Sequence, residues 1–278
     1  MKHALTIDVE DYFHVGAFEK QISPHSWDDY ECRVESNIDH ILALLDEHDI
    51  KATFFTLGWV AQRYPKVIRD IVAQGHELAS HGMNHTRVFT QDETSFRQDV
   101  KDTKSLLEHE GQCDVKGYRA ASFSINESNL WALDILADEG YRYSSSIYPI
   151  QHDHYGMKGG QRFKYHPIVG SDFIEVPPTT ARLWGRNLPA SGGGYFRLLP
   201  YLYTKFVMNK VIKEDQQSVI FYFHPWEVDP EQPRILNAPF KSRFRHYTNL
   251  SIMESKLSRL MQSYEWGRMD EIFLTEQG

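Results

Sequence analysis

The chain has 278 residues, of which 41% are hydrophobic and 24% charged, and this balance excludes a disordered protein. The formal net charge of −8 argues against nucleic acid as the main partner, because phosphate neutralisation needs clustered Lys and Arg. The sequence shows no apolar stretch near the ~20 residues of a membrane span and no signal peptide, so we expect a cytoplasmic protein.

Strand and helix patterns alternate along the chain. Apolar runs predict strands over residues 4–9, 51–57, 76–80, 173–177 and 218–223. Helical spacing predicts helices over 36–48, from 65 to a stop at 75, 92–110, 128–139 and about 250–264. We interpret 149–166 and 185–197 as loops, and the proline-rich stretch after 228 as irregular. The alternation indicates βαβ units and a parallel sheet, either a barrel or an open doubly wound sheet.

A pair of histidines follows the third predicted strand, in the segment Ser-His-Gly-Met-Asn-His. His81 and His85 stand at i and i+4, so both could face one metal ion from a helical turn. Imidazole is a common ligand of Zn²⁺ and similar ions. Surface or capping histidines are the alternative, because the chain has 14 histidines and chance pairs occur. The position directly after a strand is where an α/β fold places its site.

Three acidic residues end the first predicted strand. Asp8, Glu10 and Asp11 would be costly there unless they are paired or bound to a metal. Asp8 and Glu10 share one strand face, because side chains alternate along a strand. One carboxylate could complete a metal site while another acts as a general base. A solvated acidic turn is the alternative.

Two further residues follow predicted strands. His224 comes directly after the run that ends at Phe223, where it could protonate a leaving amine or be a hydrogen-bonded core histidine. Arg119 could orient a carboxylate through a bidentate contact or be a surface arginine. Each is ambiguous alone.

Other candidates carry weaker signals. Tyr195 and Trp226 could stack on sugar rings, although aromatic residues are more often core. His152, Asp153 and His154 could form a second metal site, but a polar loop is the simpler interpretation. The chain has two cysteines, Cys32 and Cys113, and we interpret both as ordinary thiols.

The order of the motifs is more informative than any one of them. In sequence they read TIDVED, TFFTLGWVA, SHGMNH, GYRAASFSI and FYFHPWEVD. This ordered set, over about residues 4–228, resembles the polysaccharide deacetylase family, the NodB-homology carbohydrate esterases. The chain also resembles one subgroup of this family, which is encoded with exosortase (PEP-CTERM) exopolysaccharide loci. The segments that carry this resemblance are DVEDYF, HDHYG at 152–156, EVPPTT at 175–180, SGGGYFRLLPY at 191–201 and RFRHYTNL at 243–250.

The resemblance implies an α/β fold, a distorted (β/α) barrel of the NodB type that binds one divalent ion, Zn²⁺ or a similar metal. It implies a catalytic domain over 1–228 and a C-terminal extension, 229–278, packed on the same domain. The roles implied by motif are a catalytic base, Asp8; an arginine that orients it, Arg119; metal ligands, His81 and His85; and a general acid, His224. The aromatic residues that we assign to substrate contact are Tyr118, Tyr195 and Trp226.

One departure from the family pattern concerns the metal. The first motif of the family has two adjacent acids, of which the second binds the metal, but here Val9 takes that second position. The carboxylate ligand must then come from Glu10 or Asp11. Relatives with a DxD form use the Glu10 offset, so we favour Glu10.

Two other departures lie in later motifs. Ala121 replaces the proline that is common after the motif-three arginine. Ser144 replaces the aspartate often seen in the fourth motif, which leaves the residue that tunes His224 open, with Asp153 as a candidate.

The sequence thus predicts a metal-dependent hydrolase that removes acetyl groups from N-acetylated sugars of an exopolysaccharide or its precursor. Its partners would be the sugar substrate and enzymes of polysaccharide assembly. Two alternatives stay open: an amide hydrolase that acts on a cyclic amide or ureide, and a catalytically silent sugar-binding protein.

Overall fold

The structure is a computed structural model in which residues 1–150 and 156–275 are described. Its strands are β1 (His3–Val9), β2 (Thr53–Thr56), β3 (Glu77–Ser80), β4 (Gly117–Tyr118), β5 (Tyr143–Ser144), β6 (Ile174–Glu175), β7 (Thr180–Leu183), β8 (Arg186–Pro189), β9 (Ile220–Phe223) and β10 (Trp266–Gly267). Its α-helices are α1 (Val34–Glu47), α2 (Gly58–Arg63), α3 (Pro65–Ala73), α4 (Glu93–Gly111), α5 (Trp131–Asp138), α6 (Gly193–Leu198), α7 (Tyr201–Lys210), α8 (Phe240–Tyr247), α9 (Met253–Met261) and α10 (Met269–Phe273).

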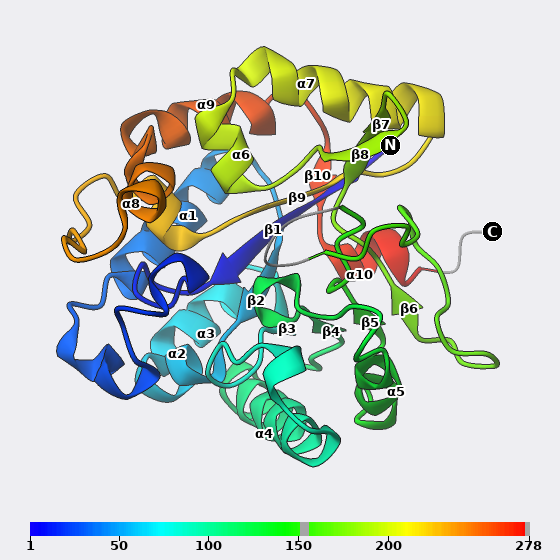
Figure 1. Cartoon of the computed structure of the whole chain (residues 1–278), viewed down its shortest axis with the longest axis horizontal. Coiled ribbons are helices and arrows are strands. Elements are labelled where there is room, and N and C mark those ends of the chain that lie inside the picture. Colours follow the sequence, from blue (N-terminus) through cyan, green and yellow to red (C-terminus); the bar gives the residue numbers. More distant parts are fainter. Residues whose placement is uncertain (151–155, 276–278) are drawn as a thin grey trace.

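Within the described residues, eight strands form one sheet in the order β10-β1-β2-β3-β4-β5-β6, with β9 paired to β1. Its strand pairings are parallel. Parallel neighbours need a crossover connection, so α1 to α5 return on the outside of the strands (Figure 1). This curled sheet with helices around it is the predicted distorted (β/α) barrel, and the fold prediction is confirmed.

The central strand β1 positions the site. All seven of its residues are buried, and it pairs with β2, β9 and β10. Because side chains alternate along a strand, Thr6, Asp8 and Glu10 point to the same side. The carboxyl ends of neighbouring parallel strands meet at one edge of the sheet, which brings the residues after β1, β3, β4 and β9 together. Those residues include Glu10, His81, Arg119 and His224.

The loop prediction for 185–197 is wrong. Residues Arg186–Pro189 form β8, which pairs antiparallel with β7, and α6 begins at Gly193. The connection of the hairpin is Trp184-Gly185, with φ of 49° and 74°. Two consecutive residues with positive φ are typical of the tight turns that match strand twist. The irregular stretch predicted after 228 also contains a helix, α8, whose sequence is too polar to show an apolar stripe.

The C-terminal segment packs on the barrel. Strand β10 extends the sheet beside β1, with His3 opposite Trp266. Leu257 and Leu260 of α9 are fully buried in the same apolar cluster as Leu5 of β1. Among the described residues, no helix combines the length and the apolar character needed to cross a bilayer.

Candidate metal and catalytic site

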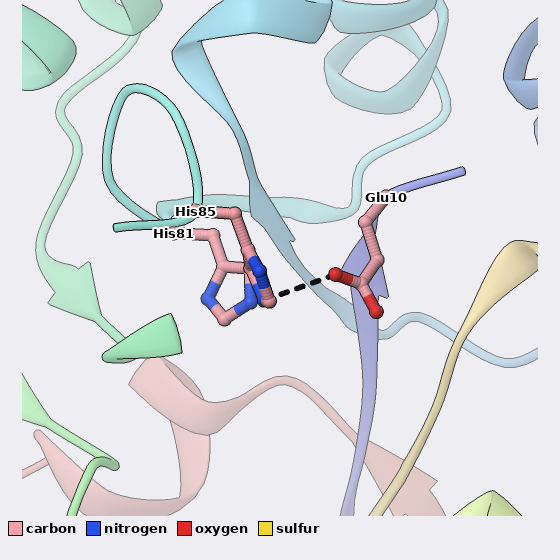
Figure 2. A group of neighbouring side chains, drawn as sticks. All are labelled: Glu10, His81 and His85. Carbon is pink, nitrogen blue, oxygen red and sulfur yellow. Dashed lines mark ion pairs between the residues drawn. The ribbon is translucent and has the colours of Figure 1, made fainter. Parts of the chain in front are cut away.

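Three side chains converge at the carboxyl edge of the sheet. Glu10 follows β1, while His81 and His85 follow β3 (Figure 2). One ligand atom from each residue lies within 4.8 Å of the other two. The Nε2 atom of His85 is 3.0 Å from Oε2 of Glu10. These residues could hold one metal ion.

The histidine pair does not have the helical geometry that its i, i+4 spacing predicts. His81 and His85 do not lie on a helical turn, because residues 81–87 form a loop. Two residues in the left-handed region fold this loop back, Gly82 at φ 77° and His85 at φ 51°. Positive φ is costly for a residue with a side chain and persists where the surrounding structure requires it, often at functional sites.

The donor set fits a divalent ion. Burial lowers the pKa of His81 to about 4 and that of His85 well below its ordinary value, so both imidazoles are neutral and able to ligate. Nδ1 of His81 lies 2.8 Å from the carbonyl oxygen of Arg119, which directs Nε2 of His81 toward the site. Oε2 of Glu10 is buried and makes no hydrogen bond of good geometry. A bound cation would satisfy this oxygen.

Asp8 is held by Arg119 in the interior. Nη1 of Arg119 lies 2.5 Å from Oδ1 of Asp8 and also donates to Thr6 Oγ1 at 2.8 Å. The guanidinium is fully buried and donates further to the backbone and hydroxyl oxygens of Ser145. The second carboxylate oxygen of Asp8 faces the pocket, 4.0 Å from Nε2 of His224. The structure therefore joins Asp8 and Arg119 as the sequence predicts.

Asp11 lies away from the metal cluster. One of its oxygens accepts hydrogen bonds from the backbone N–H groups of Arg33 and Val34, at the start of α1, and from Sγ of Cys32. The other accepts from the N–H of Tyr12. Both oxygens are thus engaged at a helix N-terminus, where a carboxylate is stabilised. This corrects Asp11 as a ligand candidate and leaves Glu10 as the carboxylate of the cluster.

His224 lies opposite Asp8 and is supported by a residue that the sequence reasoning missed. Its Nδ1 is 3.0 Å from Oε2 of Glu227, and its Nε2 is 3.4 Å from Oε1 of Glu10. Glu227 also pairs with Arg197 at 2.8 Å, and both side chains are buried. Burial alone would lower the pKa of His224, but Glu227, Glu10 and Asp8 outweigh it and raise this pKa to about 9. Burial opposes the charge of Glu227, but Arg197 and His224 lower its pKa to about 2.

The HPWE segment held a usable signal for this pair. An acid three residues after a histidine faces it when the chain turns, and here a 3₁₀ turn over Pro225–Val228 brings them together. Arg197 gave no such signal, because it reaches Glu227 from a distant helix. Ser144, at the position of the missing aspartate, instead donates to Ser146 at 2.7 Å. Asp153, His152 and His154 lie outside the described residues.

A pocket of about 440 Å³ opens over these groups. Its inner wall contains Asp8, Glu10, His81, His85 and His224. Of the three aromatic residues assigned to substrate contact, only Trp226 lines it.

The other two aromatic assignments are corrected. Tyr118 is 2% exposed and packs in the core against Phe96 and Tyr141. Its position next to Arg119 on a strand turns its ring to the opposite face. Tyr195 lies on α6 and lines a separate, much smaller pocket.

Two families match consecutive parts of the chain. Residues 19–144 match the family described as polysaccharide deacetylase, and residues 145–274 match a domain of unknown function, DUF3473. Over residues 19–144 the chain is therefore similar to the polysaccharide deacetylase family.

Two curated relatives are deacetylases of N-acetylated sugars. The chain is 30% identical over 95 residues to a peptidoglycan-N-acetylglucosamine deacetylase of Bacillus cereus, which covers 34% of each protein. It is 34% identical over 67 residues to a chitooligosaccharide deacetylase of Rhizobium leguminosarum bv. trifolii, covering 24% of this chain and 31% of that protein. The matches thus span about a third of each relative.

The fold also occurs in the solved structure of another protein. The structure of Puue allantoinase aligns with a TM-score of 0.62 and 14% identity, covering 97% of this chain and 87% of that chain. At this identity the likeness concerns the fold alone.

Proposed function

We propose that the protein is a metal-dependent N-deacetylase that removes acetyl groups from N-acetylated sugars of an exopolysaccharide or its precursor. One observation carries the proposal: a carboxylate held by an arginine, Asp8, and a histidine held by a carboxylate, His224, line the same pocket as the cluster of Glu10, His81 and His85. Amide hydrolysis requires a base that takes the proton of the attacking water and an acid that protonates the leaving amine. The curated relatives support the sugar substrate.

The metal would be held by Glu10, His81 and His85. A divalent ion such as Zn²⁺ would polarise the acetamide carbonyl there and lower the pKa of the attacking water. The protein contributes neutral imidazoles and a buried carboxylate oxygen, and these match the ligand preferences of zinc.

Asp8 acts as the general base in this proposal. Its free oxygen faces the pocket and takes the proton of the attacking water. Arg119 fixes the other oxygen and leaves Asp8 a single orientation. The guanidinium is itself fixed by Thr6 and Ser145, so the base is positioned before the substrate arrives.

His224 acts as the general acid. It protonates the departing sugar amine from Nε2, while Nδ1 is held by Glu227. A pKa raised to about 9 means that His224 carries its proton at neutral pH. Glu227 fixes the ring, and Arg197 fixes Glu227, so these two are positioning residues.

Two alternative functions predict different results. A cyclic-amide or ureide hydrolase would act on a panel of such compounds and leave acetylated sugars intact. A silent sugar-binding protein would hold metal and bind sugar with no turnover. We further propose Zn²⁺ as the metal, an exosortase-linked exopolysaccharide role with its assembly enzymes as partners, and a cytoplasmic location. The sequence resemblance and the composition support these three proposals.

The first experiment measures metal content and acetate release together. We expect about one divalent ion per chain in wild type and loss of the ion in His81→Ala/His85→Ala, because imidazoles supply two of the three ligands. The control is His25→Ala/His109→Ala, which removes two exposed histidines. Wild type should release acetate from N-acetylated oligosaccharides such as chitotetraose. Absence of metal after reconstitution, or metal without turnover, would contradict the proposal.

A further inference from the structure

The outer wall of the pocket has a charge opposite to that of the chain. The whole sequence has 30 Lys and Arg against 38 Asp and Glu. The outer lining of the pocket comes from residues 15–21, Arg87 and 239–245. Its charged members are four cations and one acid: Lys20, Arg87, Lys241, Arg245 and Glu19. Positive charge is therefore concentrated at the mouth of the site.

Three of these cations are available to a ligand. Glu19 pairs with Arg87 at 2.7 Å, so these two charges offset each other. In the part of the chain that the structure describes, Lys20, Lys241 and Arg245 have no ion pair, and all three side chains are exposed. Fold stability gives no account of three unpaired cations in one pocket wall.

Helix α8 supplies two of them at a local cost. Lys241 and Arg245 stand at i and i+4, so they lie on one helix face, and like charges at this spacing destabilise a helix. The sequence of α8 contains no acid to offset them. The arrangement is explained if a negative charge from outside the chain completes it.

The three cations are also held on a fixed frame. Phe18, two residues before Lys20, packs on the rings of His246 and Tyr247 at 4.7 and 6.0 Å, which joins the η1 segment to α8. Nη2 of buried Arg197 donates to the carbonyl oxygen of Arg245. Figure 1 shows α8 beside the segment that follows β1. These three residues, Lys20, Lys241 and Arg245, form the cation wall of the pocket. Through Arg197, the cation wall contacts the residues that support His224.

We propose that Lys20, Lys241 and Arg245 form a subsite for an oxyanion carried by the substrate beside the acetylated sugar. This rests on the proposed function and narrows its substrate to an acidic glycan. Arginine and lysine are the side chains that bind carboxylate and phosphate oxygens. Two sources supply such an oxyanion: the carboxylate of a neighbouring uronic acid, or the phosphate of a glycosyl phosphate.

Equilibrium binding tests the subsite without depending on turnover. The dissociation constants of three probes are measured calorimetrically on the full chain: neutral chitotetraose, a hyaluronan tetrasaccharide in which N-acetylglucosamine alternates with glucuronate, and N-acetylglucosamine 1-phosphate. The variants are Lys241→Gln/Arg245→Gln and Lys20→Gln. The control is Lys205→Gln, which removes an exposed charge on α7 outside the pocket lining.

We expect at least one anionic probe to bind about tenfold tighter than chitotetraose at low salt, with the preference lost in the double variant and at high salt. Preference for hyaluronan identifies a carboxylate source, and preference for the sugar phosphate identifies a phosphate source. No anionic preference in wild type, or an unchanged preference in the double variant, overturns the subsite. Acetate release from the same samples tests the deacetylase proposal separately, because a subsite can fail while neutral sugar is still deacetylated.

Discussion

The metal side of the pocket, with Glu10, His81 and His85, differs from the acid side, with His224, Glu227 and Arg197, in how its polar atoms are satisfied. On the metal side a buried carboxylate oxygen makes no hydrogen bond of good geometry. On the acid side both oxygens of Glu227 are engaged, one with Arg197 and one with His224. Buried polar groups are stable only when paired. The metal side is therefore built to be completed by an ion, and the acid side is completed by the protein.

The two sides also come from different parts of the chain. His81 and His85 lie in the segment that matches the polysaccharide deacetylase family, and His224, Glu227 and Arg197 lie in the segment described as a domain of unknown function. The second segment is no separate body in the structure, because its strand β9 pairs with β1 in the same sheet. It supplies the acid side of the pocket together with the cation wall of α8.

The largest effect is expected for Asp8→Asn, which removes the base and leaves the metal side intact. The amide cannot accept a proton from the attacking water, and general-base catalysis contributes about 10²- to 10⁴-fold to rate. We expect kcat for acetate release to fall by that range while metal content stays at the wild-type level. Asp28→Asn, at an exposed carboxylate, is the control. Retained activity, or loss of the ion, would contradict the separation of base and metal.

Glu227→Gln tests the acid side, with a smaller expected loss. Removing a supporting carboxylate typically costs about 10- to 100-fold in activity. The loss should appear with N-acetylated sugar, whose amine must be protonated, and be much smaller with 4-nitrophenyl acetate, whose leaving group needs no proton. The ratio of the two rates does not depend on the fraction of folded protein, so it is informative even if the variant is less stable.

The matched control for Glu227→Gln is Glu231→Gln, which makes the same change at an exposed residue in the same segment. Equal loss on amide and ester would mean that Glu227 supports only the structure of the pocket. In that case the positioning role for Glu227 and Arg197 would be abandoned.

The difference between the two sides explains what the sequence could predict. Residues that end strands of a parallel sheet meet at one edge, so Asp8, His81, Arg119 and His224 were found from strand patterns and motif order. The loop geometry of His85 was not predictable, because it depends on a left-handed residue that is not glycine. The sequence could not decide between Glu10 and Asp11 as the metal ligand. Only the position of α1 shows that Asp11 accepts hydrogen bonds at the N-terminus of that helix.

Contacts between distant segments were beyond the sequence. Arg197 reaches Glu227 across 30 residues, and no local pattern marks such a pair. The assignment of Tyr118 to substrate contact is wrong because neighbours on a strand face opposite sides, so its position beside Arg119 turns its ring into the core.

The pH dependence of metal binding sharpens the comparison on the metal side. Burial raises the pKa of Glu10 to about 7, while the pKa of His81 is lowered to about 4. Below pH 7 the ion must displace a proton from Glu10, and the histidines stay neutral. Affinity should therefore fall by about tenfold for each pH unit below 7, the slope for release of one proton.

This slope is measured by Zn²⁺ competition titration at several pH values between 5 and 8. Glu19→Gln, on the same pocket wall but outside the metal cluster, should keep the wild-type slope. Affinity that does not change with pH would show that Glu10 is already ionised, and a two-proton slope would show that a histidine ionises as well.

The smallest expected effect comes from two adjacent glycines at the start of α6, Gly193 and Gly194. Gly193 lies directly against Glu227 of the acid side. A Cβ at Gly193 would lie 1.9 Å from Oε2 of Glu227, whereas a Cβ at Gly194 would meet nothing within 4 Å. Gly193→Ala should displace Glu227 and lower kcat several-fold with the amide substrate, with metal content unchanged. Gly194→Ala should keep full activity and raise the free energy of unfolding by about 0.5–1 kcal/mol, because alanine favours a helix over glycine. Denaturant unfolding and acetate release on both variants check this. If Gly193→Ala were as active as Gly194→Ala, the position of Glu227 would not matter to the acid, and the acid side would not be held in the way the buried Arg197–Glu227–His224 contacts indicate.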